Sequence, residues 1–169
     1  MTDKACSGDA NTVKSVYTKS GADLGLPGTR LFPGQVISAP AEDVDVDLKD
    51  GTRVRLEKGA RVRLECLDPG PGRPLSQRIS LLVGTVWAKV SSALGADRDF
   101  QVTTQFSGAG ARGTDFWMTC EPSRKRTTLR VVHGVVSFRR RRAPGRAILV
   151  RAGRTAIHQG DGAPRLVRG

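Results

Sequence analysis

The chain has 169 residues, of which 38% are hydrophobic and only 5% aromatic, and it contains 20 glycines and nine prolines. This length suffices for one domain with an aliphatic core, and the sequence has no run of about 18 apolar residues that could span a membrane as a helix. The 28 basic residues outnumber the 16 acidic ones, and 23 of the bases but only eight of the acids lie after residue 50. Such asymmetry indicates either contact with an anionic surface or a solvated, arginine-rich strand surface.

The N-terminal part of the chain is polar and rich in turns. Residues 1–19 are expected to form a loosely ordered lead-in with one strand around residues 13–17, and they contain no apolar core of a signal peptide. A turn-rich stretch then leads to a short strand at residues 35–38. Residues 43–48, DVDVDL, alternate between acidic and apolar residues, which is the pattern of a strand with one buried and one solvated face.

Two nearly identical octapeptides follow, DGTRVRLE at residues 50–57 and KGARVRLE at residues 58–65. In both units apolar and polar residues alternate after the glycine, and the glycine lies where the chain must bend. The repeat therefore predicts two short strands with a tight connection, either a hairpin or one step of a coil of stacked strands. The residues expected to point into the core, from two adjacent strands, are Val54, Leu56, Val62 and Leu64.

The remainder of the chain consists of short apolar segments separated by turns. Gly84 separates two expected strands, the glycine-rich segment SGAGARG at 107–113 is expected to be a loop, and the tail at 161–169 is expected to fray. Between these points we predict strands at residues 78–82, 85–90, 100–103, 115–119, 127–132, 135–139, 147–151 and 155–158.

This series of about a dozen short strands defines the expected fold class. No segment of ten residues has the period of a helix, so an all-β domain is predicted, with many short strands in a twisted two-sheet, solenoid-like stack or sandwich. The sequence shows one domain at residues 20–160, between the lead-in at 1–19 and the tail at 161–169.

Few residues suggest chemistry. His133 stands beside a turn glycine, the only other histidine is His158, and no carboxylate pair is placed near either one. Glycine-rich loops bind phosphate groups when they open a helix, but the segment at 107–113 leads into an expected strand. No order of residues typical of a nucleophilic triad stands out either. We therefore expect no catalytic residue, no metal site, no cofactor and no enzyme activity.

Trp117 is a candidate binding residue. It follows Phe116, which is expected to face inward, so the indole ring should face outward on its strand. An outward tryptophan can serve as an anchor for a partner protein. It can equally lie over arginine side chains as part of the surface.

Four consecutive arginines, Arg139, Arg140, Arg141 and Arg142, lie between two expected strands. Asp161 is the only acidic residue among the last 31 residues, so these arginines cannot all be paired within the domain. We expect them to project into water from a hairpin loop and to bind phosphate or carboxylate groups.

The three cysteines are Cys6, Cys66 and Cys120, and none belongs to a C-x-x-C pair, which speaks against a zinc site. Cys66 and Cys120 each end an apolar strand and precede a proline-containing loop. Equivalent ends of two strands are a suitable setting for a disulfide, and two buried thiols fit the pattern equally well.

Five motifs, in order, resemble the FecR domain, the periplasmic sensor module of iron-dicitrate-type regulators. They are Asp50-Gly51-Thr52, Leu81 to Gly84, Phe100 to Thr103, Gly113-Thr114-Asp115-Phe116, and Val132 to Val135. The resemblance covers roughly residues 20–160 and implies an all-β stack of short strands. Full regulators of that family also have an anti-sigma segment, a transmembrane helix and a C-terminal domain. None of these fits within 169 residues, so a free-standing module without anti-sigma activity is expected.

The resemblance implies a function as well. It favours a non-catalytic binding or sensory module outside the cytoplasm, periplasmic or secreted, that contacts a protein or an anionic envelope polymer. An oxidising compartment in turn implies a Cys66–Cys120 disulfide that leaves Cys6 free. The alternative is a cytoplasmic nucleic-acid-binding domain that uses the basic C-terminal third, although the usual combination of aromatic and basic residues is missing.

Overall fold

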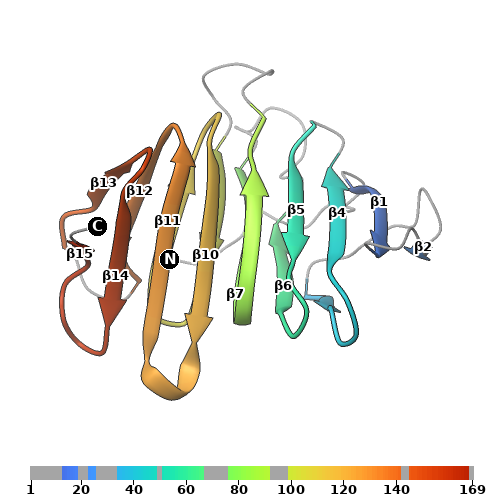
Figure 1. The fold of residues 1–169 in the computed structure, drawn as a ribbon, viewed down its shortest axis with the longest axis horizontal. Coiled ribbons are helices and arrows are strands. Elements are labelled where there is room, and N and C mark those ends of the chain that lie inside the picture. Colours follow the sequence, from blue (N-terminus) through green and yellow to red (C-terminus); the bar gives the residue numbers. More distant parts are fainter. Residues whose placement is uncertain are drawn as a thin grey trace.

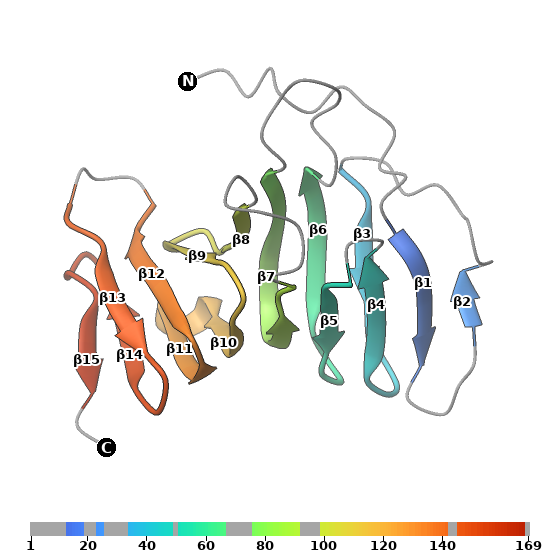
Figure 2. The same ribbon diagram turned by 90° about the horizontal axis from the view of Figure 1, so that it is seen from above.

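The protein folds into two facing β-sheets that share one strand (Figures 1 and 2). The computed structural model describes residues 13–18, 23–25, 34–48, 51–66, 76–91, 99–141 and 145–167. The front sheet, which faces the reader in Figure 1, has the order β2-β1-β4-β5-β7-β10-β11-β14-β15. The back sheet has the order β3-β6-β7-β8-β9-β12-β13.

Most strands follow the expected segments, and the exceptions are β2, β7, β9 and β15. The front sheet comprises β1 (Val13–Thr18), β2 (Asp23–Gly25), β4 (Val44–Leu48), β5 (Arg53–Leu56), β7 (Ser76–Lys89), β10 (Asp115–Glu121), β11 (Arg126–His133), β14 (Thr155–Gln159) and β15 (Arg165–Val167). The back sheet adds β3 (Val36–Ser38), β6 (Arg61–Cys66), β8 (Asp99–Thr103), β9 (Ser107–Ala111), β12 (Val135–Arg140) and β13 (Ile148–Arg151). In the described residues the only helical segment is the 3₁₀ turn Pro122–Arg124, and no helix there is long and apolar enough to cross a membrane. The prediction of an all-β fold is confirmed.

Strand β7 joins the two sheets, and this corrects the expectation of two strands separated by Gly84. Its first half pairs with β6 and β8 in the back sheet, and its second half pairs with β5 and β10 in the front sheet. Gly84 lies at the transition with φ of +92°, a conformation that favours glycine. A Cβ atom on Gly84 would lie 2.7 Å from the Cα of Ala60. The glycine therefore bends the strand instead of ending it.

The octapeptide repeat supplies one strand to each sheet. Val54, Leu56, Val62 and Leu64 are all buried, as predicted, with 0–3% of their surface exposed. The expectation that they come from two adjacent strands is wrong, because β5 and β6 lie in opposite sheets and pair with different halves of β7. The two copies thus face each other across the core.

The glycine-rich segment at 107–113 corrects a second expectation, since its first five residues form strand β9 and not a loop. β9 is paired on both sides, with β8 and with β12. Ser107, Ala109 and Ala111 point into the core, so Gly108 and Gly110 face the outer side of the back sheet, where Arg139 covers Gly108. The sequence SGAGA therefore forms a strand that has small residues on both faces.

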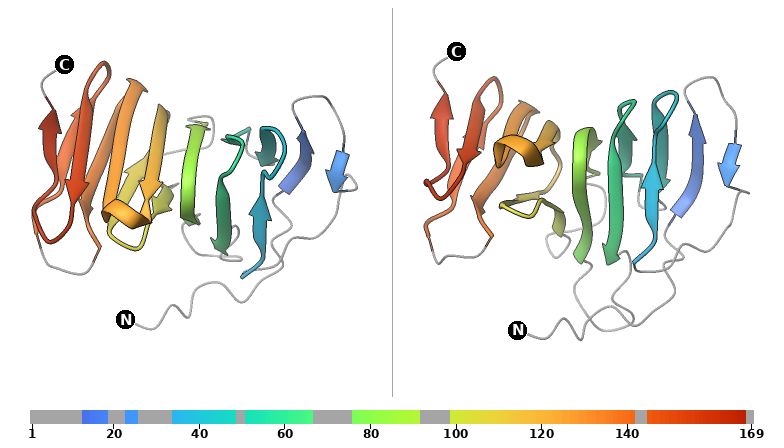
Figure 3. Two further views of the ribbon diagram at one scale, coloured as in Figure 1. Left: turned by 60° about the horizontal axis from the view of Figure 1, so that its bottom comes forward. Right: turned by 90° about the horizontal axis from the view of Figure 1, so that it is seen from below.

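The chain ends are more ordered than expected where they are described. Residues 165–167 of the expected frayed tail form β15, which pairs with β14, and β1 pairs with both β2 and β4. Figure 3 shows β1 and β2 at one end of the molecule and the C-terminal strands at the other. Between them a single hydrophobic core runs along the molecule, with Phe100, Phe116 and Phe138 as its largest fully buried members.

Candidate binding surfaces

The outward residues of the front sheet lie in rows that cross the strands. One row contains Asp45, Arg55, Trp87, Trp117 and Arg130, which are direct neighbours on β4, β5, β7, β10 and β11. The two indole rings have centroids 6.3 Å apart and are tilted by 39°, which is a usual spacing for an aromatic pair. Trp117 therefore faces outward, as predicted, and shares the centre of this face with Trp87.

Arg55 is held in place from two directions. Its guanidinium carbon lies 5.4 Å from the centre of the Trp87 ring, and its Nε donates to Asp45 Oδ1 over 2.7 Å while Nη2 donates to Oδ2 over 3.1 Å. The hydrogen bond to Asp45 raises the pKa of Arg55. Trp87 Nε1 in turn donates to Asp115. The sequence suggested that an arginine could lie over Trp117, but in the structure Arg55 lies over the neighbouring Trp87.

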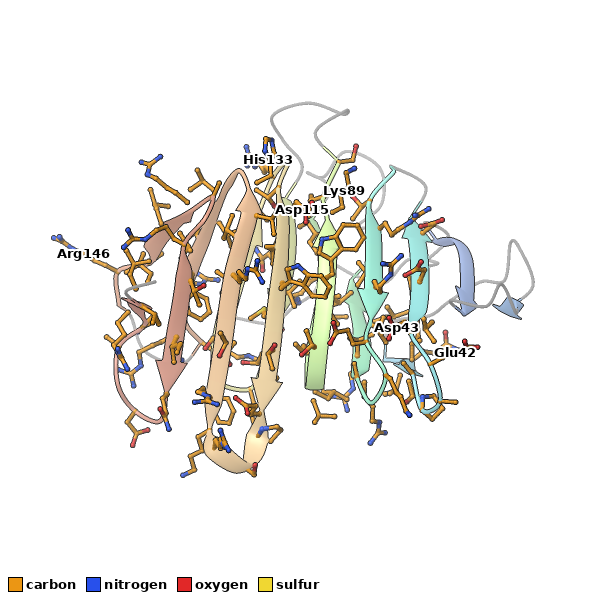
Figure 4. All side chains as sticks on the ribbon, in the orientation of Figure 1. Glu42, Asp43, Lys89, Asp115, His133 and Arg146 are labelled. Atoms are coloured by element: carbon orange, nitrogen blue, oxygen red, sulfur yellow. The ribbon has the colours of Figure 1, made fainter. Side chains whose placement is uncertain are left out.

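Charges on the front sheet alternate and are paired across strands. Arg53 binds Asp47 with an Nε–Oδ1 distance of 2.7 Å, and Arg126 binds Glu121 with an Nε–Oε2 distance of 2.7 Å. Figure 4 shows Lys89, Asp115 and His133 at the upper ends of neighbouring front strands, where opposite charges again stand side by side. Most of the described charges on this face therefore have an opposite charge on a neighbouring strand.

The outer face of the back sheet is different, because almost all of its charged residues are arginines. The alternation of β6, β7, β8, β9, β12 and β13 assigns its outward residues. Among the described side chains this face has six arginines and one acidic residue, Glu65, which accepts a hydrogen bond from Ser80 Oγ. The arginines, which we call the back-face arginines, are Arg61, Arg63, Arg78, Arg112, Arg139 and Arg151.

A furrow of about 430 Å³ crosses this basic face along β9. Its floor is the backbone of β9 at Gly108 and Gly110, where no side chain projects. Gln101 on β8 forms one side, and on the other side Ser137 lies on β12 with Leu149 beyond it on β13. The remaining lining residues are Ala109, Ala111, Arg112, Val135, Arg139 and Ala147.

The expected basic loop is only partly a loop. Arg139 and Arg140 belong to β12 and point to opposite sides of it: Arg139 lines the furrow, whereas Arg140 lies near His158. Arg141 donates from Nη1 to the carbonyl oxygen of Thr104 over 3.1 Å. The expected loop position is therefore wrong for Arg139 and Arg140, which belong to β12. Arg141 follows the strand and is exposed, and Arg142 lies outside the described residues.

A cluster of buried polar side chains lies between the two sheets near β14. His158 is 2% exposed, its Nδ1 lies 2.6 Å from Ser107 Oγ, and its Nε2 is buried without a hydrogen bond. Beside it Thr104 Oγ1 lies 2.9 Å from Thr127 Oγ1. Burial lowers the pKa of His158, because desolvation disfavours the charged imidazolium, and nearby Arg140 lowers it further. The environment therefore favours the neutral form of the ring. His133, in contrast, is exposed.

The predicted Cys66–Cys120 disulfide is not formed. Cys120 has a free, buried thiol that donates to the carbonyl oxygen of Leu82 over 3.7 Å, and burial raises the pKa of this thiol to about 11. The backbone registers explain why. Cys66 is paired with Arg78 and Cys120 with Gly84, which are six residues apart on β7, or roughly 20 Å in a strand. A disulfide needs Cα atoms within about 7 Å.

Comparisons with known proteins identify the family. The family model described as FecR protein matches residues 35–159, so the chain belongs to the FecR family. No curated protein matches the sequence. Two crystal structures of a proposed anti-sigma factor from Parabacteroides distasonis, at 1.65 and 2.50 Å resolution, each align with a TM-score of 0.62 and 18% identity. Each alignment covers 79% of this chain and 58% of the other protein, so the two proteins share a fold over part of the larger one.

Sequence reasoning predicted the outward positions of Trp117 and Arg139, but it did not predict the furrow or the burial of His158. The signal for the furrow was present: in SGAGA small residues alternate with glycines at the period of a strand, between two segments that were themselves expected to be strands. His158 gave no such signal, because its burial depends on Ser107, which is 51 residues away in sequence. Within the described ranges, no group of three or more histidine, cysteine, aspartate or glutamate residues could hold a metal ion.

Proposed function

We propose that this chain is a non-catalytic sensory or regulatory module that acts outside the cytoplasm and binds an anionic partner through the outer face of the back sheet. The observation that carries the proposal is the separation of charge between the two faces. The front sheet pairs its charges across strands, whereas the described outward side chains of the back sheet comprise six arginines and one acidic residue, Glu65. Membership in the FecR family and the fold shared with a proposed anti-sigma factor support a regulatory role.

Nucleic acid is the alternative partner. Single strands are usually held by basic grooves combined with aromatic rings on which bases stack. Both tryptophans of the chain lie on the front sheet, and the back-face arginines have no aromatic side chain among the residues that line the furrow. The distribution of side chains therefore favours an acidic protein surface or an envelope polymer.

A heparin column run with a salt gradient tests the proposal. Replacing Arg61 and Arg63 with threonine removes two charges from the back face and keeps residues that suit strands. The matched control replaces Arg130 and Arg165 with threonine and removes two charges from the front sheet. We expect the back-face variant to elute at clearly lower salt than the parent and the front-face variant to elute close to the parent, since exposed charges act within about 8 Å at physiological ionic strength.

Two results would contradict the proposal. Equal shifts for both variants would mean that net charge alone governs binding. Tight, sequence-selective binding of the parent to duplex DNA would favour the nucleic-acid alternative. Fractionation of cells that express the native gene tests the location, and recovery of the protein in the cytoplasmic fraction would contradict that part of the proposal.

A further inference from the structure

The furrow along β9 has the dimensions of an extended polypeptide. Strands β8 and β12 flank β9 on either side, so the rows of side chains that border the furrow lie roughly 9–10 Å apart. The floor from Gly108 to Arg112 spans four residue steps, or about 13 Å of strand. An extended segment of about four to six residues fits this length.

The lining of the furrow combines apolar and positively charged groups. Leu149 is 57% exposed and Val135 is 38% exposed, and both line the furrow together with Ala147. Burial of this apolar surface by a partner would contribute favourably to the free energy of binding. Arg139 stands at the Gly108 end and Arg112 at the other end. No aromatic ring is among the described residues that line the furrow, and aromatic rings are the side chains that present a flat apolar face to a sugar or a base.

Arg139 is placed to bind a carboxylate in the furrow. Its side chain lies across Gly108, with Nε 3.7 Å and Cγ 3.9 Å from the position that a Cβ on Gly108 would occupy. The guanidinium is exposed, and it has no ion-pair partner among the described residues. A planar guanidinium can bind a carboxylate through two parallel hydrogen bonds.

From these observations we infer that the furrow is a binding site for an extended, acidic peptide segment of a partner protein in which apolar and acidic side chains alternate. The apolar side chains contact Val135 and Leu149, and a carboxylate binds Arg139. The inference rests on the proposed function and names the class of partner and the place where it binds. Its charge complementarity comes from the back-face arginines.

Gly108→Val tests the site without altering charge. The backbone at Gly108 does not require glycine, because its φ is not positive, and a Cβ there would meet its nearest neighbours at ordinary contact distances of 3.7–3.9 Å. Valine suits a strand better than glycine does, so the variant should be at least as stable as the parent. Its methyl groups would fill the floor of the furrow and displace the Arg139 side chain that lies across Gly108. Leu149→Ser, a change at an exposed residue, removes the apolar contact and serves as the second variant.

The probe is a capped hexapeptide in which aspartate alternates with valine or leucine, and binding is measured by fluorescence anisotropy at 150 mM salt. The control peptide has asparagine in place of aspartate. We expect the acidic peptide to bind the parent, the neutral control to bind at least tenfold more weakly, and both Gly108→Val and Leu149→Ser to lose at least tenfold in affinity. Both variants should elute from heparin at the same salt as the parent.

The outcomes separate the inference from the proposed function. If Gly108→Val and Leu149→Ser bind the acidic peptide as well as the parent does, the furrow is not the site. If the neutral peptide binds equally well, charge does not select the ligand. In either case the inference about the furrow fails. The proposed function would still be supported if the variant with Arg61 and Arg63 replaced eluted from heparin at lower salt than both the parent and the front-face variant. If the parent binds neither heparin nor the acidic peptide, the proposed function itself fails.

Discussion

At the scale of single residues, His158 is a titratable group whose burial has a measurable consequence. The ring is almost fully enclosed, bonded through Nδ1 to Ser107, and flanked by Arg140 and Asp161. Its environment opposes protonation overall, because desolvation and Arg140 outweigh the favourable effects of the Gly162 backbone and Asp161. The folded protein therefore binds a proton less readily than the unfolded chain, whose histidines titrate near pH 6.5.

We expect His158 to make the protein less stable in mild acid. Its stabilising contribution is complete above about pH 6.5 and is lost as the pH falls toward the lower folded-state pKa, with a slope of at most about 1.4 kcal/mol per pH unit. Urea titrations at pH 7.5, 6.5 and 5.5 measure this slope in the parent and in His158→Gln. The variant should be less stable at pH 7.5 but should show a shallower dependence on pH. Parallel curves for the two proteins would exclude the assigned role of His158.

Cys120 is expected to be chemically inert in the folded protein. Its thiol is 1% exposed, and its pKa of about 11 leaves almost no thiolate at neutral pH, although the thiolate is the reactive species. Iodoacetamide at pH 7.5, followed by peptide mass spectrometry, should leave the Cys120 peptide unmodified under native conditions and modify it fully in urea. Recovery of a Cys66–Cys120 disulfide from the unreduced protein, or rapid native labelling of Cys120, would contradict the structure.

At the scale of elements, the chain turns between the sheets where a glycine permits it. Gly84 and Gly59 have the same φ of +92°, but their surroundings differ. A Cβ on Gly84 would lie 2.7 Å from the Cα of Ala60, whereas a Cβ on Gly59 would have no neighbour within 4 Å. The two positions therefore separate the conformational cost of a side chain from the cost of a steric clash.

The paired substitutions Gly84→Ala and Gly59→Ala should destabilise the protein to different extents. Gly59→Ala is expected to cost about 1–2 kcal/mol, the penalty for a left-handed conformation. Gly84→Ala is expected to cost roughly 2–4 kcal/mol, because the backbone of Ala60 must also move. Chemical denaturation of the two variants measures the difference, and equal losses would show that β7 and Ala60 are packed less closely than the structure indicates.

At the scale of the whole molecule, we expect the two sheets to unfold together, because they share β7. The strand lies in both sheets, with β6 and β8 on its first half and β5 and β10 on its second. Both tryptophans lie on the front sheet, so their fluorescence reports on that sheet, whereas far-ultraviolet circular dichroism reports on all strands. The two signals should lose their native values at the same urea concentration, as in a two-state transition. An earlier transition in fluorescence would mean that the front sheet unfolds separately.

The sequence by itself determined the class of fold and the orientation of most side chains. Alternation of apolar and polar residues at period two is a local signal, and it correctly placed Val54, Leu56, Val62 and Leu64 in the core and Trp117 on the surface. The ordered motifs also identified the family. These features were predictable because the direction of a side chain depends on the parity of its position in a strand.

Only the tertiary structure decided which strands meet and where charges gather. The repeated octapeptides have the same local pattern, yet they lie in opposite sheets, because β7 bends at Gly84 and offers each copy a different half of its length. The same bend places Cys66 and Cys120 at positions that no disulfide can join. The charge of the back face and the furrow along β9 likewise arise from strands far apart in the chain, since register between strands is set by packing and hydrogen bonding over long range.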